Sequence, residues 1–420
     1  MDNPARGALT GAMKRDADVI VVGGGLNGPA LALALAQAGL SVIVIDAQPA
    51  RARAEAAFDG RAYALAIASK RLLQAVGVWN RIEGGIQPIL EIKASDGRAG
   101  EGPAPFFLHF DAAEIEEGPM GFMVEDRHLY AALLAAMAET EGLTHLPGAT
   151  VVAQDVDAGG ASVTLADGRV LRGALIAGCD GRTSGTAERA GIGRTGWDYG
   201  QTALVCAVEH DLPHHGVAHQ FFMPSGPLAI LPLTGNRSSI VWSEGTEVAA
   251  EIAALDDAGF LEVLRPRFGD FLGEIRLAGG RFRYPLNLTL ADRYAAERVA
   301  LVGDAAHGVH PIAGQGLNLG FRDVGALAEV LVDAARRGED IGGLLVLERY
   351  QDWRRFDSTA LALGMDGVNR LFSSDSALLR GVRDLGMGLV GAVPSLRRAF
   401  IRQAAGVAGV PPKLLRGVGL

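Results

Sequence analysis

The stretch VIVVGGGLNGPALALALAQAGLSVIVID, residues 19–46, decides the fold of this 420-residue chain. It holds a run of four β-branched residues, three adjacent glycines, an uncharged segment rich in Ala and Leu, and a second β-branched run. This order is typical of a βαβ unit, because parallel strands buried on both faces read as continuous apolar runs. The lack of charge from residue 19 to residue 45 would also suit a membrane-spanning helix, but the clustered glycines and the two β-branched runs favour the βαβ unit.

The glycine cluster carries a dinucleotide-binding motif. Gly23, Gly25 and Gly28 fit the pattern G-x-G-x-x-G, in which the first glycine permits a tight turn, the second lets a pyrophosphate approach the backbone, and the third lets the helix sit close to the strand. Asp46 ends the second β-branched run, where a carboxylate can accept hydrogen bonds from a ribose hydroxyl pair. An acidic residue at this place favours FAD or NAD over NADP.

A second glycine-rich run, GDAAHGVHPIAGQGLNLGFRD at residues 303–323, helps to choose between these cofactors. It follows the apolar run 299–302, which we interpret as a strand that delivers Gly303 and Asp304 to the middle of the cofactor. Asp304 can hold a hydroxyl group there, while the turn 314–316 offers backbone amides to an electron-rich ring edge. A flavin needs both contacts, because it has a ribityl chain and a pyrimidine edge that becomes anionic on reduction.

Composition excludes several classes of protein. A net charge of −9 argues against general nucleic-acid binding, which needs a basic surface. Two cysteines are too few for a disulfide framework, and the start of the chain lacks the layout of a signal peptide, so we expect a cytoplasmic protein. His307 and His310 are spaced i, i+3 without a Cys or carboxylate companion, so no metal site is expected. We expect His214, His215 and His219 in a surface loop.

The length of the chain suggests two domains, or one domain with a large insertion. Apolar periodicity predicts helices at 67–78, 127–140, 317–335 and 344–356, and strands at 149–156, 161–165 and 170–171, the last two forming a hairpin. Between residues 197 and 285 the pattern changes to short alternating or aromatic runs, at 203–208, 220–223, 228–233 and 239–242. We interpret these runs as an antiparallel sheet inserted between parts of an α/β domain.

The last fifty residues form a basic and amphipathic tail. Residues 371–420 contain seven basic and two acidic residues, a charge of +5 in a chain whose total is −9. Such a tail could lie on an anionic membrane surface. It could equally form terminal helices that pack on the body of the protein with their arginines in solvent.

The run 310–323, HPIAGQGLNLGFRD, resembles the signature of the FAD hydroxylases of ubiquinone biosynthesis, the UbiH/UbiF-type branch of the flavoprotein aromatic monooxygenases. The resemblance extends to residues 59–62, 177–182, 215–222 and 226–233. It implies a fold like that of p-hydroxybenzoate hydroxylase, with a Rossmann-like α/β FAD-binding domain, an inserted antiparallel-sheet substrate domain and a C-terminal helical tail. The expected boundaries are 16–78, 120–192 and 286–365 for the FAD-binding domain, 79–119 and 193–285 for the substrate domain, and 366–420 for the tail.

The resemblance also implies a set of site residues. Asp180 and Gly181 would lie near the pyrophosphate and the path of the nicotinamide cofactor, and residues 316–318 would present backbone groups to the flavin ring. The sequence departs from the family pattern at two positions. Ala187 stands where the family usually has Arg, and Arg189 is a possible substitute for that arginine. Cys179 stands where the family often has Ala. The expected cofactor contacts are Gly23, Gly25, Gly28, Asp46, Arg61, Arg127, Asp180, Gly181, Gly303, Asp304, Gly314, Gly316, Leu317 and Asn318, with Pro311 and Gln315 near the ring and Phe222, Leu231 and Trp242 as an apolar substrate wall.

The reaction that the resemblance implies is ring hydroxylation of a polyprenylated phenol with O2, through a flavin C4a-hydroperoxide. Since only the G-x-G-x-x-G motif at 23–28 follows a run of β-branched residues, NAD(P)H would bind transiently as the reductant. Two alternatives are a soluble hydroxylase of small aromatic compounds and a non-catalytic FAD-binding scaffold of a ubiquinone-synthesis complex. A plain NAD dehydrogenase would leave Asp180 and Asp304 unexplained. We expect peripheral contact with the inner face of the cytoplasmic membrane, and no nucleic-acid partner.

Overall fold

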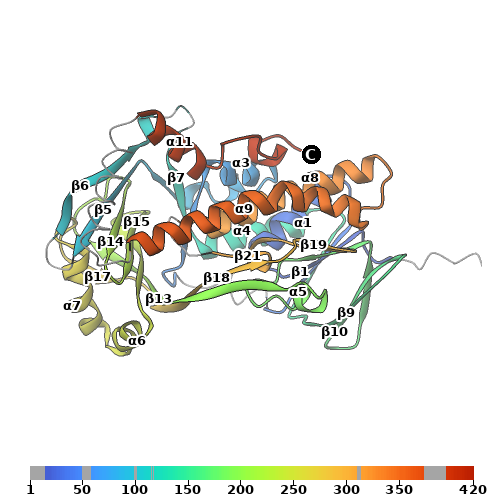
Figure 1. Cartoon of the computed structure of the whole chain (residues 1–420), viewed down its shortest axis with the longest axis horizontal. Helices are drawn as coiled ribbons and strands as arrows, with labels where there is room; N and C mark the ends of the chain where they lie inside the picture. Colours follow the sequence, from blue (N-terminus) through green and yellow to red (C-terminus); the bar gives the residue numbers. More distant parts are fainter. Residues whose placement is uncertain are drawn as a thin grey trace, which may run out of the picture.

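The computed structural model describes residues 15–49, 58–98, 102–114, 116, 118–309, 314–372 and 394–420, and all structural statements below concern these residues. The expected ring neighbour Pro311 and the second histidine, His310, lie outside them. Figure 1 shows two large sheets at opposite ends of the molecule, with the long helix α9 (Leu344–Phe372) running between them.

A six-stranded sheet with the order β19-β20-β12-β1-β2-β8 contains the predicted βαβ unit. Strands β1, β2, β8, β12 and β20 run parallel, and only β19 is antiparallel to its neighbour. The carboxyl ends of the parallel strands therefore meet at one edge, where an open α/β sheet binds its ligands. The strands are β1 (Val19–Val22), β2 (Val42–Asp46), β8 (Leu143–Pro147), β12 (Leu175–Gly178), β19 (Ala295–Ala296) and β20 (Val299–Leu301).

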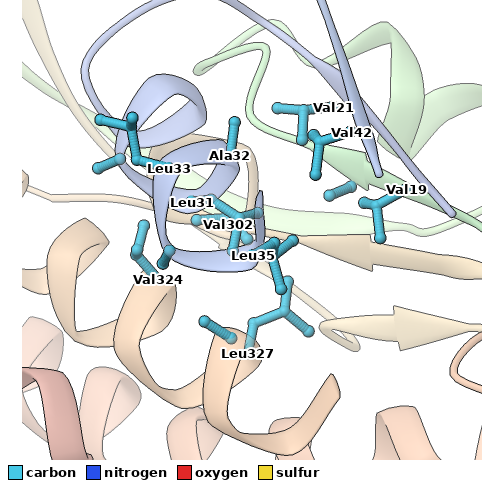
Figure 2. Packing of buried hydrophobic residues seen from close by; sticks show 14 of the residues in the cluster. Val19, Val21, Leu31, Ala32, Leu33, Leu35, Val42, Val302, Val324 and Leu327 are labelled. Carbon is cyan, nitrogen blue, oxygen red and sulfur yellow. The ribbon is translucent and has the colours of Figure 1, made fainter. Parts of the chain in front are cut away.

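Helix α1 (Asn27–Gln37) lies between this sheet and helix α8 (Gln315–Arg336). Figure 2 shows Leu31 and Leu35 of α1 pointing between Val19 of β1 and Leu327 of α8, and all four side chains are fully buried. Each buried leucine contributes about 1.5–3 kcal/mol to folding. Contacts on both sides explain why the segment carries no charge, and no helix among the described residues is long and apolar enough to cross a membrane.

A nine-stranded sheet confirms the predicted antiparallel insertion. Its order is β21-β18-β13-β16-β15-β14-β5-β6, with β17 pairing to β13, and all neighbours are antiparallel except β14 and β5. The parallel pair joins the segment around residue 90 to a sheet built mainly from residues 194–291. The strands are β5 (Glu91–Arg98), β6 (Gly102–Asp111), β13 (Arg194–His210), β14 (Val217–Met223), β15 (Gly226–Leu233), β16 (Arg237–Gly245), β17 (Ile275–Leu277), β18 (Phe282–Ala291) and β21 (His307–Gly308).

The two faces of this large sheet have different neighbours. Helices α6 (Thr246–Ala254) and α7 (Asp257–Phe268) cover the outer face. The inner face packs against a small sheet of β3 (Ala62–Leu65), β7 (Gly121–Glu125) and β4 (Ile86–Ile89). The inner face is therefore the one that lies toward the residues expected near the flavin.

The predicted hairpin is part of a second three-stranded sheet, β11-β10-β9, in which Thr164 pairs with Val170. Helices α3 (Ile67–Ala75) and α4 (Asp126–Glu139) match their predicted ranges to within about three residues at each end. The remaining elements are β9 (Val151–Asp157), β10 (Gly160–Leu165), β11 (Val170–Gly173), α5 (Gly185–Arg189), α11 (Pro394–Ala404), and the short 3-10 helices η1 (Trp79–Arg81), η2 (Glu83–Gly85), η3 (Ala112–Glu114), η4 (Gly303–Ala305) and η6 (Lys413–Arg416).

The prediction that the helix after residue 344 ends at 356 is wrong, because α9 continues to Phe372. Its second half contains Ser, Thr and Gly, which disfavour helix in isolation. Buried contacts extend it: Ala362 and Met365 join a cluster with Leu288 and Val309. Tertiary packing therefore outweighs helix propensity here.

The described part of the C-terminal tail packs on the body. Leu414 and Leu415 in η6 are buried in the main core, and Lys413 Nζ lies 3.3 Å from Asp333 Oδ1. Arg397 Nε lies 2.7 Å from Glu114 Oε2. For residues 394–420 the structure thus agrees with the packing alternative, whereas residues 373–393 of the tail lie outside the described residues.

Candidate FAD site

The glycine cluster after β1 is shaped by backbone contacts. Gly23 has φ +114°, and a Cβ there would lie 2.3 Å from the carbonyl oxygen of Cys179. A Cβ on Gly28 would lie 2.0 Å from the carbonyl oxygen of Gly23. These two glycines are therefore required by the protein itself, the first for the turn and the third for close contact between α1 and the turn.

Gly24 and Gly25 differ in what they face. A Cβ on Gly24 would lie 2.3 Å from Asp46 Oδ2, which explains why the middle residue of the three adjacent glycines has no side chain. Around Gly25 no described atom lies within 4 Å of the Cβ position. Leu26 precedes α1 without a side-chain cap, and no acidic residue occupies the first turn. The open backbone at Gly25 and the uncapped amides of α1 fit an anionic pyrophosphate.

The carboxylate of Asp46 is held in place at the end of β2. Its side chain is buried, with Oδ2 accepting a hydrogen bond from the Tyr130 hydroxyl at 3.1 Å and Oδ1 accepting one from the Gln48 amide at 3.0 Å. The predicted ribose-binding group is thus preorganised beside Gly24. Tyr130, which the sequence reasoning missed, supplies this orientation from α4.

Asp180 turns its carboxylate toward its own chain. It accepts hydrogen bonds from the Ser184 hydroxyl at 2.5 Å and from the Thr186 amide and hydroxyl, both at 2.9 Å, and so stabilises the start of α5. Gly181 has φ +78°, and no described atom lies within 4 Å of its Cβ position. The structure therefore places the Gly181 backbone, rather than the Asp180 side chain, at an open surface after β12. Their cofactor roles stay predictions.

Ala187 and Cys179, the two residues that depart from the family pattern, both contribute to packing. Ala187 is fully buried, and its amide donates to the Ser184 hydroxyl at 3.0 Å. Arg189 Nε lies 3.4 Å from Gln154 Oε1. Burial raises the pKa of the Cys179 thiol far above its usual value, so this group stays protonated and belongs to the core.

Arg182 is a site residue to which the sequence reasoning gave no role of its own. Its Nε donates to Asp304 Oδ2 at 3.1 Å, Nη2 to the Val309 carbonyl at 2.9 Å, and Nη1 to Asn287 Oδ1 at 3.3 Å. It therefore joins the turn after β12 to the turn after β20. The signal available in the sequence was its place in the run 177–182 that resembles the family.

His307 does have a carboxylate companion, contrary to the sequence expectation. Its Nε2 donates to Asp323 Oδ2 at 2.5 Å, and both side chains are completely buried. The same oxygen accepts the Gly303 amide at 3.0 Å. The pair does not amount to a metal centre, since the described residues contain no group of three or more His, Cys, Asp or Glu that could hold an ion.

The turn that precedes α8 is locked by the side chain of Asn318. Asn318 Oδ1 accepts the Ala66 amide at 2.8 Å and the Ser69 hydroxyl at 2.6 Å, and Nδ2 donates to the carbonyls of Ala64 at 2.9 Å and Gly314 at 3.1 Å. Gly314 has φ +62°, and a Cβ there would lie 3.0 Å from the Ala64 Cβ. The amide of Asn318 therefore serves the turn, and only its backbone is left for a ring contact.

The first residues of α8 leave an accessible amide edge. The nearest described atom to a Cβ on Gly316 lies 4.0 Å away. Gln315 and Leu317 are both half-buried, and Leu317 packs against the main core. The helix has no side-chain cap and no acidic residue in its first turn. This end of α8 fits an electron-rich ring edge, as predicted for a flavin.

Both predicted arginines are paired with carboxylates. Arg61 Nε donates to Asp59 at 2.8 Å, a bond that raises the pKa of the guanidinium. Arg127 Nε donates to the buried Glu125 at 2.8 Å, and Arg237 Nη2 reaches the other oxygen of Glu125 at 2.9 Å. Arg237, which sequence reasoning missed, brings a strand of the large sheet to the end of β7. The flavin roles of Arg61 and Arg127 stay predictions.

Trp242, which was predicted for the apolar substrate wall, lies on the outer face of the large sheet. It pairs in register with Leu204 and Leu228 and is buried among the outer-face residues, with its ring 6.1 Å from that of Phe260 in α7. Its Nε1 donates to Glu244 Oε1 at 3.1 Å. Trp242 therefore faces away from the parallel sheet and anchors the covering helices.

Leu231 and Phe222 lie on the inner face of the large sheet. Leu231 packs with Ala62 and Ala64 of β3, the strand that also contacts Gly314. Phe222 follows Phe221, which points into the outer cluster, so side-chain alternation directs Phe222 inward. These two predicted residues remain candidates for the substrate wall.

Of the three histidines near residue 215, His219 differs from expectation, whereas His214 and His215 lie in a loop as predicted. His219 is not in a loop but in β14, with its ring 4.5 Å from that of Phe271. Burial, reinforced by the nearby Lys93, lowers its pKa to about 4, so the ring is neutral at physiological pH. His214 is half-buried, and its Nε2 donates a hydrogen bond to the Leu233 carbonyl at 2.7 Å. Only His215 is exposed.

Comparison with known sequences gives the same assignment along nearly the whole chain. The profile of the FAD binding domain family matches residues 16–360. The chain is 46% identical over 419 residues to the ubiquinone hydroxylase UbiL of Rhodospirillum rubrum, covering 99% of this chain and 96% of that protein. It is 35% identical to the 3-demethoxyubiquinol 3-hydroxylase of Escherichia coli, covering 93% and 98% of the two chains.

Comparison with solved structures confirms the predicted fold. The crystal structure of p-nitrophenol 4-monooxygenase PnpA from Pseudomonas putida superposes with a TM-score of 0.78 at 20% identity, covering 95% of this chain and 100% of that one. At this identity the similarity concerns the fold. It is the p-hydroxybenzoate hydroxylase-like fold of FAD monooxygenases, which combines parallel and antiparallel sheets.

Proposed function

The chain belongs to the family of FAD-dependent ubiquinone hydroxylases, and on that premise we propose that it hydroxylates the ring of a polyprenylated phenol. O2 supplies the oxygen atom, and NAD(P)H acts as a transient reductant. The observation that carries the proposal is the identity of 46% over 99% of the chain, supported by groups at Gly25, Asp46 and the start of α8 whose arrangement fits FAD.

The apolar inner face of the large sheet supports a phenolic substrate. Ala218, Leu231 and Leu233 pack in one cluster with Ala64, whose Cβ position lies beside the Gly314 turn. An apolar surface thus reaches the turn that is expected to contact the ring edge of the flavin. A prenylated ring would be held there mainly by burial of apolar area, which contributes about 25 cal/mol per Å².

Bound FAD supplies the activation of O2, and the protein supplies binding, orientation and exclusion of water. The uncapped start of α8 would offer a partial positive charge to the ring edge that becomes negative on reduction. The Gly23–Gly28 loop and Asp46 would hold the adenosine half, and Asp304 the ribityl chain. The described residues around this site provide these binding groups, and we assign no side-chain acid or base.

We extend the proposal to the place where the enzyme works, the inner face of the cytoplasmic membrane beside other enzymes of the pathway. A polyprenylated substrate resides in the bilayer, and Arg398 of α11 is exposed in a tail whose charge is +5. Sedimentation with anionic vesicles is expected to recover the protein at low salt and to release it at high salt. Recovery that is the same with zwitterionic vesicles would contradict an electrostatic contact.

The proposed pathway is tested by mass spectrometry of quinone extracts after deletion of the gene. A prenylated phenol that lacks one hydroxyl group is expected to accumulate, and the missing position identifies the ring carbon. Normal ubiquinone, together with turnover of small phenols by the purified protein, would instead indicate a hydroxylase of soluble aromatics. Bound FAD without NAD(P)H oxidation would indicate a scaffold.

Substitutions on the two faces of the large sheet are expected to change different quantities. On the outer face we expect a loss of stability, and on the inner face a weaker binding of the substrate. Trp242→Phe removes the hydrogen bond to Glu244 and weakens the contact with Arg267, whose guanidinium lies 4.8 Å from the Trp242 ring. We expect the free energy of unfolding to fall by about 2 kcal/mol, with no change in KM for the phenol. Denaturation curves and steady-state kinetics measure the two effects.

Leu231→Ala is the matched substitution on the inner face, where the side chain is only half-buried. We expect KM for a prenylated phenol to rise by about tenfold, because the lost contact area corresponds to about 1.4 kcal/mol. A rise in KM for Trp242→Phe but not for Leu231→Ala would contradict this assignment, because it would indicate that the substrate binds on the outer face of the large sheet.

A further inference from the structure

Asp323 of α8 connects three separate elements around one buried carboxylate. Its Oδ2 accepts hydrogen bonds from the Gly303 amide at 3.0 Å and from His307 Nε2 at 2.5 Å. Its Oδ1 accepts a hydrogen bond from Arg354 Nε of α9 at 2.8 Å. Asp323 and His307 are completely buried and Arg354 is 3% exposed. The turn after β20 is therefore tied through Asp323 to the long helix α9.

The charges in this network balance one another. Burial alone would raise the pKa of Asp323, but the charges and hydrogen bonds of His307 and Arg354 outweigh it and hold that pKa below its usual value. Burial likewise opposes a charged His307, yet Asp323 raises the His307 pKa above its usual value. Arg354 Nη1 also reaches Asp357 at 2.6 Å. Removing one member leaves a buried charge without its partner, which is strongly unfavourable.

The turn held by this network is the one expected to contact the ribityl chain. Gly303 has φ +64°, and a Cβ there would lie 2.2 Å from Asn27 Nδ2, so the turn is packed directly against the first residue of α1. The hydrogen bond from the Gly303 amide to Asp323 fixes the orientation of the Val302–Gly303 peptide, one residue before Asp304. The Asp304 carboxylate is partly exposed and lies 3.1 Å from Arg182 Nε, on the open side of the turn.

We propose that Asp323, His307 and Arg354 are positioning residues that hold the Gly303–Asp304 turn in the conformation that binds the ribityl chain of FAD. The position of α9 then controls how tightly the flavin half of the cofactor is held. Among the described residues, no hydrogen bond joins Asp323, His307 or Arg354 to the Gly23–Gly28 loop or to Asp46, the groups expected to hold the adenosine half. The proposal rests on FAD binding and on the expected role of Asp304, and it is independent of the substrate.

The test compares the affinities of the apoprotein for FAD and for ADP, which occupies only the adenosine half of the site. For Arg354→Gln we expect the FAD dissociation constant, measured by flavin fluorescence, to rise by about tenfold or more, while that of ADP, measured by calorimetry, changes by less than about twofold. Arg355→Gln is the matched control, because Arg355 is the exposed neighbour on the same helix, and both of its constants are expected to equal those of the parent.

A general loosening of the fold would weaken both ligands in proportion, and this result would overturn the proposal, as would unchanged FAD affinity. If Arg354→Gln gives no folded protein, the same two affinities are measured for Arg354→Lys. An ammonium group can still pair with Asp323, but it cannot also reach Asp357 and Ser358 as the guanidinium does. This variant is expected to give an intermediate loss of FAD affinity, again without a change for ADP. Neither ligand requires turnover, so the result does not depend on whether the enzyme hydroxylates the proposed substrate.

Discussion

Gly25→Ala is expected to lower the affinity for FAD by about a hundredfold, equivalent to about 2.7 kcal/mol, while the apoprotein remains as stable as the parent. The added methyl group meets no described atom within 4 Å, and Gly25 does not have a positive φ, so the protein itself accommodates alanine. The methyl group would, however, occupy the space in which the pyrophosphate approaches the backbone. Flavin titration of the apoprotein and its denaturation curve measure the two quantities.

Two other glycines serve as controls for this prediction. Gly84→Ala, at an exposed site where the Cβ position is also open, should change neither quantity. Gly28→Ala should lower both, because its Cβ would lie 2.0 Å from the Gly23 carbonyl oxygen. Parent-like FAD affinity in Gly25→Ala would show that the pyrophosphate does not bind over this loop.

Asn318→Ala is expected to reduce the free energy of unfolding by about 3 kcal/mol and to abolish hydroxylation. The substitution leaves the buried amide of Ala66 and the buried hydroxyl of Ser69 without their acceptor, and it frees the Gly314 carbonyl. The turn at the start of α8 then loses the bonds that fix its conformation. Denaturation curves give the stability, and product analysis gives the activity.

Asn236→Ala is the control, because this exposed amide makes a single hydrogen bond, to the Asp211 carbonyl at 3.1 Å. Its effect on stability should be about 0.5 kcal/mol or less. If Asn318→Ala reduced the free energy of unfolding no more than Asn236→Ala does, the four hydrogen bonds of Asn318 would not be what holds the turn.

Features that depend on residues close together in the chain could be predicted from the sequence. The βαβ unit, the roles of Gly23 and Gly28, and the position of Asp46 all follow from a pattern within 28 residues. The antiparallel insertion also showed in its short alternating strands. Such patterns are local, and each expresses the geometry of a single element or turn.

The features that escaped prediction depend on pairs far apart in the chain. Arg182 and Asp304 are 122 positions apart, and Arg237 and Glu125 are 112 apart. Asp323 and His307 lie in the same glycine-rich run, but their pairing requires α8 to fold back onto the turn. The face on which Trp242 lies could not be predicted, because alternation shows that a strand has two faces without showing which layer each face contacts.

The measurement that tests the central claim most directly is turnover of a polyprenylated phenol by the FAD-loaded protein under O2 labelled with oxygen-18. With NAD(P)H present, we expect the product to be heavier than the substrate by one labelled oxygen atom, located on the aromatic ring. Oxidation of NAD(P)H that yields only hydrogen peroxide, with the correct prenylated phenol bound and its ring unlabelled, would contradict the assignment of this chain as a ring hydroxylase.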